Sequence, residues 1–317
     1  MSLPIFDVLA IGELNPDLIL AGLKAEGPRL GTEQEFGAYF LTLGSSTAIA
    51  CVLMQRLGLA TAMCAYVGDD DYGRHCRAAL EAEQVDVALV RVHPTLATGL
   101  SVSLPYPADR MILTCKGTMI LNPADIVNAD RLGQARHVHV GSFFLQNGLR
   151  KAVGELFRTA RGLGISTSLD TGWDPQDQWL TNDLREALAN TDYLFPNSLE
   201  FERLAETDDV DRGIARLIDI GVGAVIVKRG AEGAVHGDAD ARHDHQGFRA
   251  QPIDTTGAGD SFNAGYLAAM LRGGSVADRL AFGNACGALT VTAVGGTNGV
   301  RNAAQVRAFI AQRSSPE

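Results

Sequence analysis

Several familiar motifs are missing from this chain of 317 residues. No Gly-x-x-x-x-Gly-Lys-Ser/Thr occurs, which excludes a P-loop, and no Gly-x-Gly-x-x-Gly follows the first apolar run, which argues against a nicotinamide enzyme. The five cysteines include no Cys-x-x-Cys pair and most of them lie in apolar contexts, so we expect mostly buried free thiols and a cytoplasmic protein. Because no apolar run is long enough to span a bilayer, we expect no membrane association.

Positive charge is also scarce. The chain has 27 Lys and Arg against 37 Asp and Glu, a formal net charge of −10, which argues against nucleic acid or an anionic membrane as a partner. A nucleotide is still compatible with this charge, because backbone N–H groups can bind a small anion locally. Since 46% of the residues are hydrophobic, the chain can bury a large core, and we expect residues 1–317 to form a single domain with a small appendage.

Short apolar runs rich in β-branched residues alternate with amphipathic stretches. The runs are Asp7–Ile11, Thr61–Val67, His137–Val140, Gly164–Leu169, Tyr193–Phe195 and Ala224–Val227. This alternation predicts an α/β fold with a mostly parallel central sheet, helices on both faces and ligands at the carboxyl ends of the strands. Two segments, Leu18–Phe40 and Val92–Thr118, interrupt the alternation and predict small strands outside the main sheet.

The most informative segment is Asp-Thr-Thr-Gly-Ala-Gly-Asp at 254–260, which runs into a helix-forming stretch. Gly257 and Gly259 lack Cβ, so successive N–H groups can converge on one anion at a helix start. Asp260 is then placed on the first helical turn, where it can accept a proton from an attacking hydroxyl while the N–H groups stabilise a transferring phosphoryl group. The plainer alternative is a tight turn whose aspartate caps the helix.

With Phe262, this segment resembles the C-terminal signature of the ribokinase family, the phosphofructokinase-B-like sugar and nucleoside kinases, because Asp-Thr-x-Gly-Ala-Gly-Asp-x-Phe is present unbroken. The resemblance implies a ribokinase-like three-layer α/β/α sandwich with a β-sheet lid formed by about residues 14–40 and 92–120, which often also makes a homodimer contact. It implies that Asp260 is the catalytic base. It further implies that the amides of Gly257, Ala258 and Gly259 form an anion hole. It also implies a monovalent cation site at Asp254 and Thr255.

The expected substrate residues lie near the N-terminus. Asn15 and Asp17 follow the first strand, and although Asn-Pro-Asp alone is typical of a turn, the resemblance implies that Asp17 binds a sugar hydroxyl. Gly44 and Ser45 lead into an apolar helix, as in the family's N-terminal signature. The family usually has a second glycine where this chain has Ser45 and often an asparagine where it has Ile49, so a polar sugar contact is left open there.

Other segments are similar to the family's nucleotide side. Asn197 and Glu200 match an Asn-x-x-Glu motif whose Glu positions Mg²⁺, usually through water, although the same residues can simply cap a helix. Lys228 follows the last strand of the series and is the phosphate candidate, while a surface Lys-Arg pair is usually just solvated. The remaining ATP candidates are Gly230 and Gly233 in the next turn and Asn284 in a small-residue helix, which equally permits close helix packing.

Two His-x-His pairs and one acidic triplet invite a metal interpretation. We expect none at either pair, because His137 and His139 fall in a buried strand and His243 and His245 in a polar loop. Asp69–Asp71 lacks the glycine and glutamate of an EF-hand and is interpreted as a strand-to-helix turn.

The sequence thus predicts an ATP- and Mg²⁺-dependent sugar kinase, with K⁺ as a further candidate. A nucleoside kinase is the nearest alternative, and a non-catalytic sugar or nucleotide sensor is a more distant one. The lid residues Tyr106, Arg110 and Met111 are candidates for specificity without a pattern that names the substrate.

Overall fold

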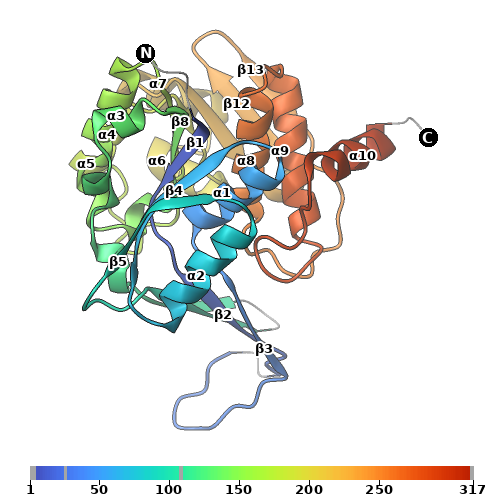
Figure 1. Ribbon diagram of the computed structural model, residues 1–317. Coiled ribbons are helices and arrows are strands. Elements are labelled where there is room, and N and C mark those ends of the chain that lie inside the picture. Colours follow the sequence, from blue (N-terminus) through green and yellow to red (C-terminus); the bar gives the residue numbers. More distant parts are fainter. Residues whose placement is uncertain (1–4, 25–26, 107–109, 315–317) are drawn as a thin grey trace.

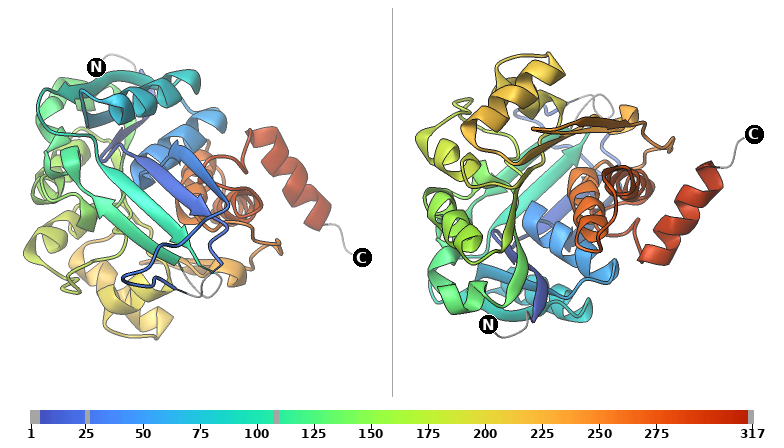
Figure 2. Two further views of the ribbon diagram at one scale, coloured as in Figure 1. Left: turned by 90° about the horizontal axis from the view of Figure 1, so that it is seen from below. Right: turned by 90° about the horizontal axis from the view of Figure 1, so that it is seen from above.

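The computed structural model describes residues 5–24, 27–106 and 110–314. Its main sheet has nine strands in the order β13-β12-β11-β10-β9-β8-β1-β4-β5 (Figures 1 and 2). The pairs from β11 to β5 are parallel, whereas β12 and β13 are added in antiparallel sense at one edge. The carboxyl ends of seven strands therefore lie at one edge of the sheet, where ligands bind in open α/β folds.

The strands of the main sheet are β1 (Phe6–Ile11), β4 (Thr61–Gly68), β5 (Asp86–His93), β8 (Ala135–Val140), β9 (Ser166–Leu169), β10 (Tyr193–Leu194), β11 (Ala224–Lys228), β12 (Ala234–Asp238) and β13 (Arg242–His245). The helices are α1 (Ser46–Arg56), α2 (Asp71–Ala82), α3 (Ala129–Leu132), α4 (Val153–Gly162), α5 (Asn182–Leu188), α6 (Ser198–Ala205), α7 (Val210–Ile220), α8 (Ala258–Met270), α9 (Val276–Thr290) and α10 (Ala303–Ser314).

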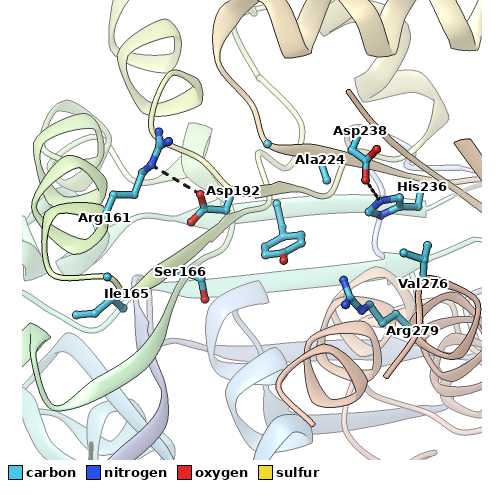
Figure 3. Close-up of a pocket in the computed structure, with 12 residues that line it drawn as sticks. Arg161, Ile165, Ser166, Asp192, Ala224, His236, Asp238, Val276 and Arg279 are labelled. Carbon is cyan, nitrogen blue, oxygen red and sulfur yellow. Dashed lines mark hydrogen bonds and ion pairs between the residues drawn. The ribbon is translucent and has the colours of Figure 1, made fainter. Parts of the chain in front are cut away.

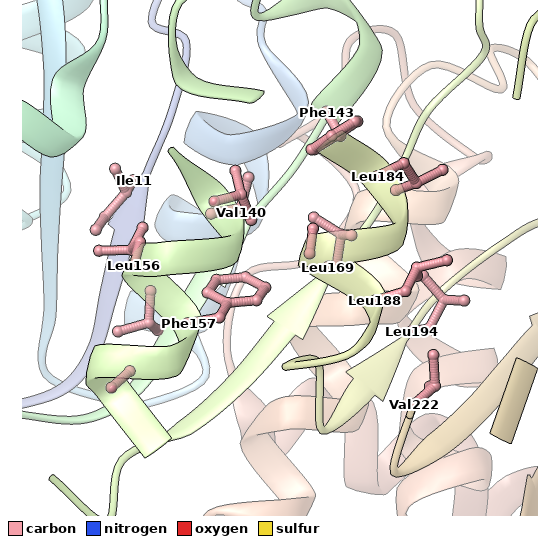
Figure 4. Packing of buried hydrophobic residues seen from close by; sticks show 14 of the residues in the cluster. Ile11, Val140, Phe143, Leu156, Phe157, Leu169, Leu184, Leu188, Leu194 and Val222 are labelled. Carbon is pink, nitrogen blue, oxygen red and sulfur yellow. The ribbon is translucent and has the colours of Figure 1, made fainter. Parts of the chain in front are cut away.

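Alternation along the strands divides the core into two layers. In β1, Leu9 and Ile11 pack with the helices α3 to α7, as Figure 4 shows for α4 and α5 around Phe157. The intervening Val8 and Ala10 face the opposite layer, which α1, α2, α8, α9 and α10 cover. Because successive strand residues point to opposite faces, a continuous apolar run is what a strand covered on both faces requires. The three-layer sandwich is confirmed.

A second, four-stranded sheet has the order β3-β2-β6-β7, and its strands are β2 (Pro16–Ala21), β3 (Ala38–Leu43), β6 (Leu100–Pro105) and β7 (Arg110–Cys115). It lies at the lower end of the molecule in Figure 1, beyond the carboxyl end of β1. The two segments predicted to leave the main sheet supply all four strands. Tyr106 is buried and Met111 is half-buried, while the Arg110 side chain lies outside the described residues.

Some details differ from the sequence-based expectations. The second histidine pair, expected in a polar loop, lies in β13, because its alternating residues pair with β12 at the edge of the sheet. The edge strand β5 and the strand β12, which lies between β11 and β13, had no clear apolar signal and were not expected. The acidic triplet does form a strand-to-helix turn, in which Asp70 caps α2 by accepting a hydrogen bond from the Gly73 N–H. Among the described residues, no helix is long and apolar enough to cross a membrane.

Candidate active site

The signature aspartate lies where the start of α8 meets the start of α1. Asp260 is on the first turn of α8, which begins after Gly257. Ser46, the first residue of α1, donates a hydrogen bond from Oγ to Asp260 Oδ1. Burial and the nearby Asp170 carboxylate raise the pKa of Asp260 to about 7, against the lowering effect of the Ser46 hydroxyl. Asp260 is thus a partly exposed carboxylate that exchanges its proton near neutral pH, as a general base requires.

The glycine turn before α8 is built by a close backbone contact. Gly257 has φ 71°, and a Cβ at this residue would lie 2.5 Å from Gly296 Cα. Only glycine fits both conditions. The helix start places the amides of Ala258 and Gly259 next to Asp260, where unpaired N–H groups and the helix dipole favour an anion. The Ala258 N–H already makes a long bond of 3.3 Å to Thr255 O, so an incoming anion competes with it.

A buried ion pair between Lys228 and Asp170 lies next to Gly259 of this turn. Lys228, at the end of β11, places Nζ 2.6 Å from Oδ2 of Asp170, which follows β9. Asn263 of α8 donates to the same Asp170 oxygen at 2.6 Å, and its own Oδ1 lies 3.4 Å from Lys228 Nζ. The side chains of Lys228 and Asp170 are only 11% and 6% exposed, so this lysine is not the solvated one of a surface pair.

Sequence reasoning missed Asp170, Asn263 and Ser46. The available signal for Asp170 was its position directly after a predicted buried strand, where a carboxylate comes to the ligand edge of the sheet. Asn263 lies one helical turn after Gly259, and that spacing alone also places it beside the turn. Ser46 carried no signal, because its contact with Asp260 spans 214 residues.

Glu200 and Asn197 form a complete capping box at the start of α6. Asn197 Oδ1 accepts a bond from the Glu200 N–H at 2.9 Å, and Glu200 Oε2 accepts one from the Asn197 N–H at 2.8 Å. Burial and the nearby Asp170 carboxylate raise the pKa of Glu200 to about 7, although Lys228 opposes this. The cap uses one oxygen of a buried carboxylate, so the motif has the structural role and keeps an oxygen that suits a cation.

Asp17 and Gly44 face each other across the start of the small sheet. A Cβ at Gly44 would lie 2.1 Å from Asp17 Oδ1, so the glycine makes room for this carboxylate. Burial, together with Asp254 and Glu13, raises the pKa of Asp17 to about 7. Nearby, Asn15 is buried and its Oδ1 has no hydrogen-bond partner in the described part of the chain. Hydroxyl-binding groups therefore gather between β1 and β2.

The residue at the second-glycine position has a structural role. Ser45 caps α1 by accepting a bond from the Ala48 N–H at 3.2 Å, and it donates from Oγ to Glu13 O at 2.5 Å. Ile49 is 2% exposed and packs in the core, where its Cδ1 would lie 2.6 Å from a Cβ at Gly296. The departure at Ile49 thus fills the layer beneath the glycine turn.

Asp254 joins two loops of the expected cation site. Its Oδ1 accepts a bond from the Thr256 N–H at 2.9 Å, and its Oδ2 accepts one from the Gly295 N–H at 2.8 Å. The Thr255 side chain lies on the same loop. In the described ranges, no group of three or more His, Cys, Asp or Glu side chains could hold a metal ion.

The remaining nucleotide candidates gather between β11 and β13. Gly230 and Gly233 have positive φ values of 56° and 97°, and a Cβ at Gly233 would lie 2.0 Å from His245 O. Asn284 of α9 reaches the same segment, with Nδ2 3.1 Å from His245 Nδ1. This turn therefore lies beside α9, at the same end of β11 as Lys228.

A surface hollow lies at the opposite end of the parallel strands, where they begin. It is lined by residues at the starts of β9, β10 and β11, among them Ser166, Tyr193 and Ala224 (Figure 3). Since Asp170 and Lys228 lie at the carboxyl ends of β9 and β11, this hollow is separate from the site. The buried His137 and His139 make hydrogen bonds of 2.7 Å to Ser168 in the neighbouring strand, which gives the first histidine pair a structural role.

Comparison with known proteins agrees with this geometry. The family model described as pfkB family carbohydrate kinase matches residues 6–303. The chain belongs to the pfkB family. An ATP-dependent ribose-1-phosphate kinase of Halopiger xanaduensis is 31% identical over 96% of this chain and 98% of its own, and a fructokinase of Klebsiella pneumoniae is 31% identical over 80% and 86%. This pfkB protein is therefore a carbohydrate kinase by family.

A solved structure gives the same result for the fold. A protein of E. coli, described as a ribokinase II in complex with ATP and Mg²⁺, matches with a TM-score of 0.86 and 26% identity over 97% of this pfkB chain and 99% of that one. The ribokinase-like sandwich with its small second sheet is thus shared with relatives of known structure.

Proposed function

We propose that this protein transfers the γ-phosphoryl group of ATP to a primary hydroxyl of a carbohydrate, with Asp260 as the general base. The observation that carries the proposal is the position of Asp260. It is a carboxylate with a pKa of about 7, on the first turn of α8 and next to the Gly257–Gly259 amides. A hydroxyl held there loses its proton to Asp260 as it attacks, while the amides stabilise charge on the phosphoryl group.

The acceptor binds between the main sheet and the small sheet. Asp17 supplies a carboxylate for sugar hydroxyls, held close by Gly44, and the unpartnered Oδ1 of Asn15 can accept a further hydrogen bond. Ser45 supports this wall through its cap. The acceptor's hydroxyl donates to the Asp260 carboxylate, which also accepts a hydrogen bond from Ser46 at Oδ1.

The nucleotide extends from the glycine turn toward α9. Its phosphates lie at the amides of Gly257 and Gly259, its ribose passes the Gly230–Gly233 turn, and Asn284 is the polar contact for the base. Small residues along this path leave room for a flat ring. The Mg²⁺ that accompanies ATP fits beside Glu200, a buried carboxylate that uses only Oε2 in the capping box of α6. When bound, it neutralises charge on the phosphate oxygens.

The small sheet acts as a lid in this proposal. Tyr39, Phe40 and Leu41 of β3 are all exposed, as are Ile112 and Leu113 of β7. Because successive strand residues point to opposite faces, both faces of the sheet are open at these strands. One face can cover the sugar, and the other can pair with a second copy, which burial of apolar area would favour. The oligomeric state measured by sedimentation tests the dimer: a monomer that keeps full activity would contradict it.

The test is ADP release with Mg²⁺-ATP across a panel of pentoses, ketoses, sugar 1-phosphates, sugar acids and nucleosides, with and without K⁺. We expect turnover on a sugar or sugar phosphate and a loss of at least about 10³-fold in Asp260→Asn, since that variant cannot accept the proton. ATP affinity should stay within a few-fold. Turnover confined to nucleosides would give the substrate class to the alternative, a nucleoside kinase. Stimulation by K⁺ that is lost in Asp254→Ala would support a cation site at Asp254 and Thr255.

A further inference from the structure

The Lys228 ammonium lies beside Gly259 of the glycine turn, and its side chain is mostly shielded from solvent. We propose that Asp170 is a positioning residue that holds this ammonium against Gly259, so that a fixed positive charge acts on the base and on the transferring group from behind the turn. The proposal rests on the role of Asp260 given above. It departs from the expectation that Lys228 binds a phosphate directly.

The first argument is the closed hydrogen-bond triangle that fixes the lysine. Asp170 Oδ2 accepts from Lys228 Nζ and from Asn263 Nδ2, each at 2.6 Å, and Asn263 Oδ1 faces the same ammonium at 3.4 Å. A free lysine stem loses about 2 kcal/mol of rotamer entropy when it is ordered. Here the ordering is completed on folding, and α8 itself supplies one of the two acceptors. The charge is therefore in place before the substrates bind.

The second argument is the shape of the turn. A Cβ at Gly259 would lie 3.3 Å from Lys228 Nζ, and the Lys228 Cε would be 3.9 Å away. Gly259 does not have a positive φ, so its backbone does not require glycine. The space that its missing side chain leaves is the space against which the ammonium packs. Gly257 thus allows the backbone conformation of the turn, and Gly259 leaves room for the Lys228 side chain.

The third argument is electrostatic. Burial would raise the pKa of Asp170 and lower that of Lys228, but their mutual attraction, together with the hydrogen bonds and other charges around them, outweighs burial in both, so the pair is ionised. The two charges act oppositely on Asp260, since Asp170 favours its protonated form and Lys228 its ionised form. While the pair is intact the two effects partly cancel at the base. Removing the charge of Asp170 or of Lys228 therefore leaves Asp260 under the influence of the remaining charge alone.

Other charges near the base and the pair enter the same balance. They come from separate elements of the fold: Glu13 after β1, His139 in β8 and Glu200 in α6. Glu200 itself responds to the pair, because Asp170 raises its pKa and Lys228 lowers it. The variants are therefore also compared in a Glu200→Gln background, where this carboxylate cannot titrate.

The experiment compares Asp170→Asn, Lys228→Met and the double variant. The acid limb of kcat/KM reports the pKa of the base in the free enzyme. We expect its midpoint to fall by about one pH unit in Asp170→Asn and to rise by about one pH unit in Lys228→Met, the range that a single neighbouring charge produces. The double variant should return toward the wild-type midpoint. A purely structural ion pair would lower stability in both single variants without moving the midpoints in opposite directions.

A second readout does not depend on turnover. Carbon-13 NMR of the aspartate carboxyls, with the Asp260 signal assigned by its loss in Asp260→Asn, follows the same titration without substrate. Unmoved midpoints, or midpoints that shift in one direction in both folded variants, would overturn the inference even when Asp260→Asn is inactive. Retained turnover in Asp260→Asn would instead overturn the proposed function. Thermal unfolding and ATP binding confirm that each variant is folded.

Discussion

Ser46 donates a hydrogen bond to the carboxylate of Asp260, so the start of α1 contacts the first turn of α8 across 214 residues of sequence. The serine favours the ionised form of the base, because a hydroxyl stabilises a carboxylate more than a carboxylic acid. In the proposed mechanism, Ser46 thus favours the ionised form of Asp260 before an acceptor binds.

Replacing this serine should weaken the base at low pH. In Ser46→Ala the pKa of Asp260 rises further above its ordinary value, so the acid limb of kcat/KM moves to higher pH. Near pH 9 the variant should approach the wild-type rate, because Asp260 is then ionised in both proteins. A pH profile of kcat/KM measures this. Ser46→Thr, which keeps the hydroxyl, is the matched control, and a uniform loss at every pH would show that Ser46 acts only by packing.

The raised pKa of Asp17 also predicts how the free energy of unfolding depends on pH. The pKa of Asp17 is about 7 in the folded protein and 3.8 ordinarily, so the folded state holds a proton that the unfolded state releases. This stability is fully present below about pH 4 and is lost as the pH rises through about 7. Asp17→Asn cannot ionise, and its melting temperature should exceed that of the wild type at pH 8 by about 2–4 °C.

The difference should vanish near pH 4, where both proteins are neutral at this residue. Thermal unfolding at both pH values gives the comparison, and Asp219→Asn, an exposed change on α7, serves as control. Equal melting temperatures at pH 8 would mean that Asp17 is not forced to ionise in a costly environment. Activity should fall in Asp17→Asn at pH 8, where the wild-type carboxylate is ionised, since the variant lacks the charged partner proposed for the sugar.

Local patterns predicted much of the scaffold. The runs of β-branched residues gave the parallel strands, because strands covered on both faces must be apolar throughout, and the glycine-aspartate segment gave a helix start. The edge strand β13 has mixed polar residues, since one of its sides meets solvent, and its sequence resembles a loop. Its pairing with β12 depends on tertiary contacts that no short window contains.

Part of the candidate site could not be predicted either, because some of its residues meet only through tertiary contacts. Asp260 and its glycines lie in one segment, so the sequence displays them together. The Asp170–Lys228 pair joins residues 58 positions apart, at the ends of two strands that are not neighbours in the sheet. A sequence shows that each follows a strand, but strand order decides that they meet. Lys228 was therefore predicted to bind phosphate before its partner was known.

The turn before α8 predicts a strong effect of one methyl group. Gly257→Ala places a Cβ 2.5 Å from Gly296 Cα at φ 71°, so the loops must separate, and we expect activity to fall by at least about 10²-fold, as misplacement of a catalytic group by about 1 Å does. Gly273→Ala is the matched control, because Gly273 has φ 79° with no atom within 4 Å of a Cβ. It carries the backbone strain alone, about 1–2 kcal/mol, without the clash. Steady-state kinetics and thermal unfolding of both variants make the comparison, and equal losses would show that strain, not contact with Gly296, limits Gly257.

Glu200 allows the capping and the metal roles to be separated. Glu200→Gln keeps an oxygen that can accept the bond from the Asn197 N–H, so the capping box of α6 survives and the melting temperature should change little. The amide carries no charge, and the Mg²⁺ concentration for half-maximal rate should rise about tenfold or more if the carboxylate helps to place the ion. Asn197→Ala makes the opposite change: it removes the cap, at about 1 kcal/mol, and leaves the carboxylate in place. Magnesium titrations at saturating ATP, paired with thermal unfolding of both variants, separate the roles. A Glu200→Gln protein with an unchanged magnesium requirement would leave this motif a helix cap and nothing more.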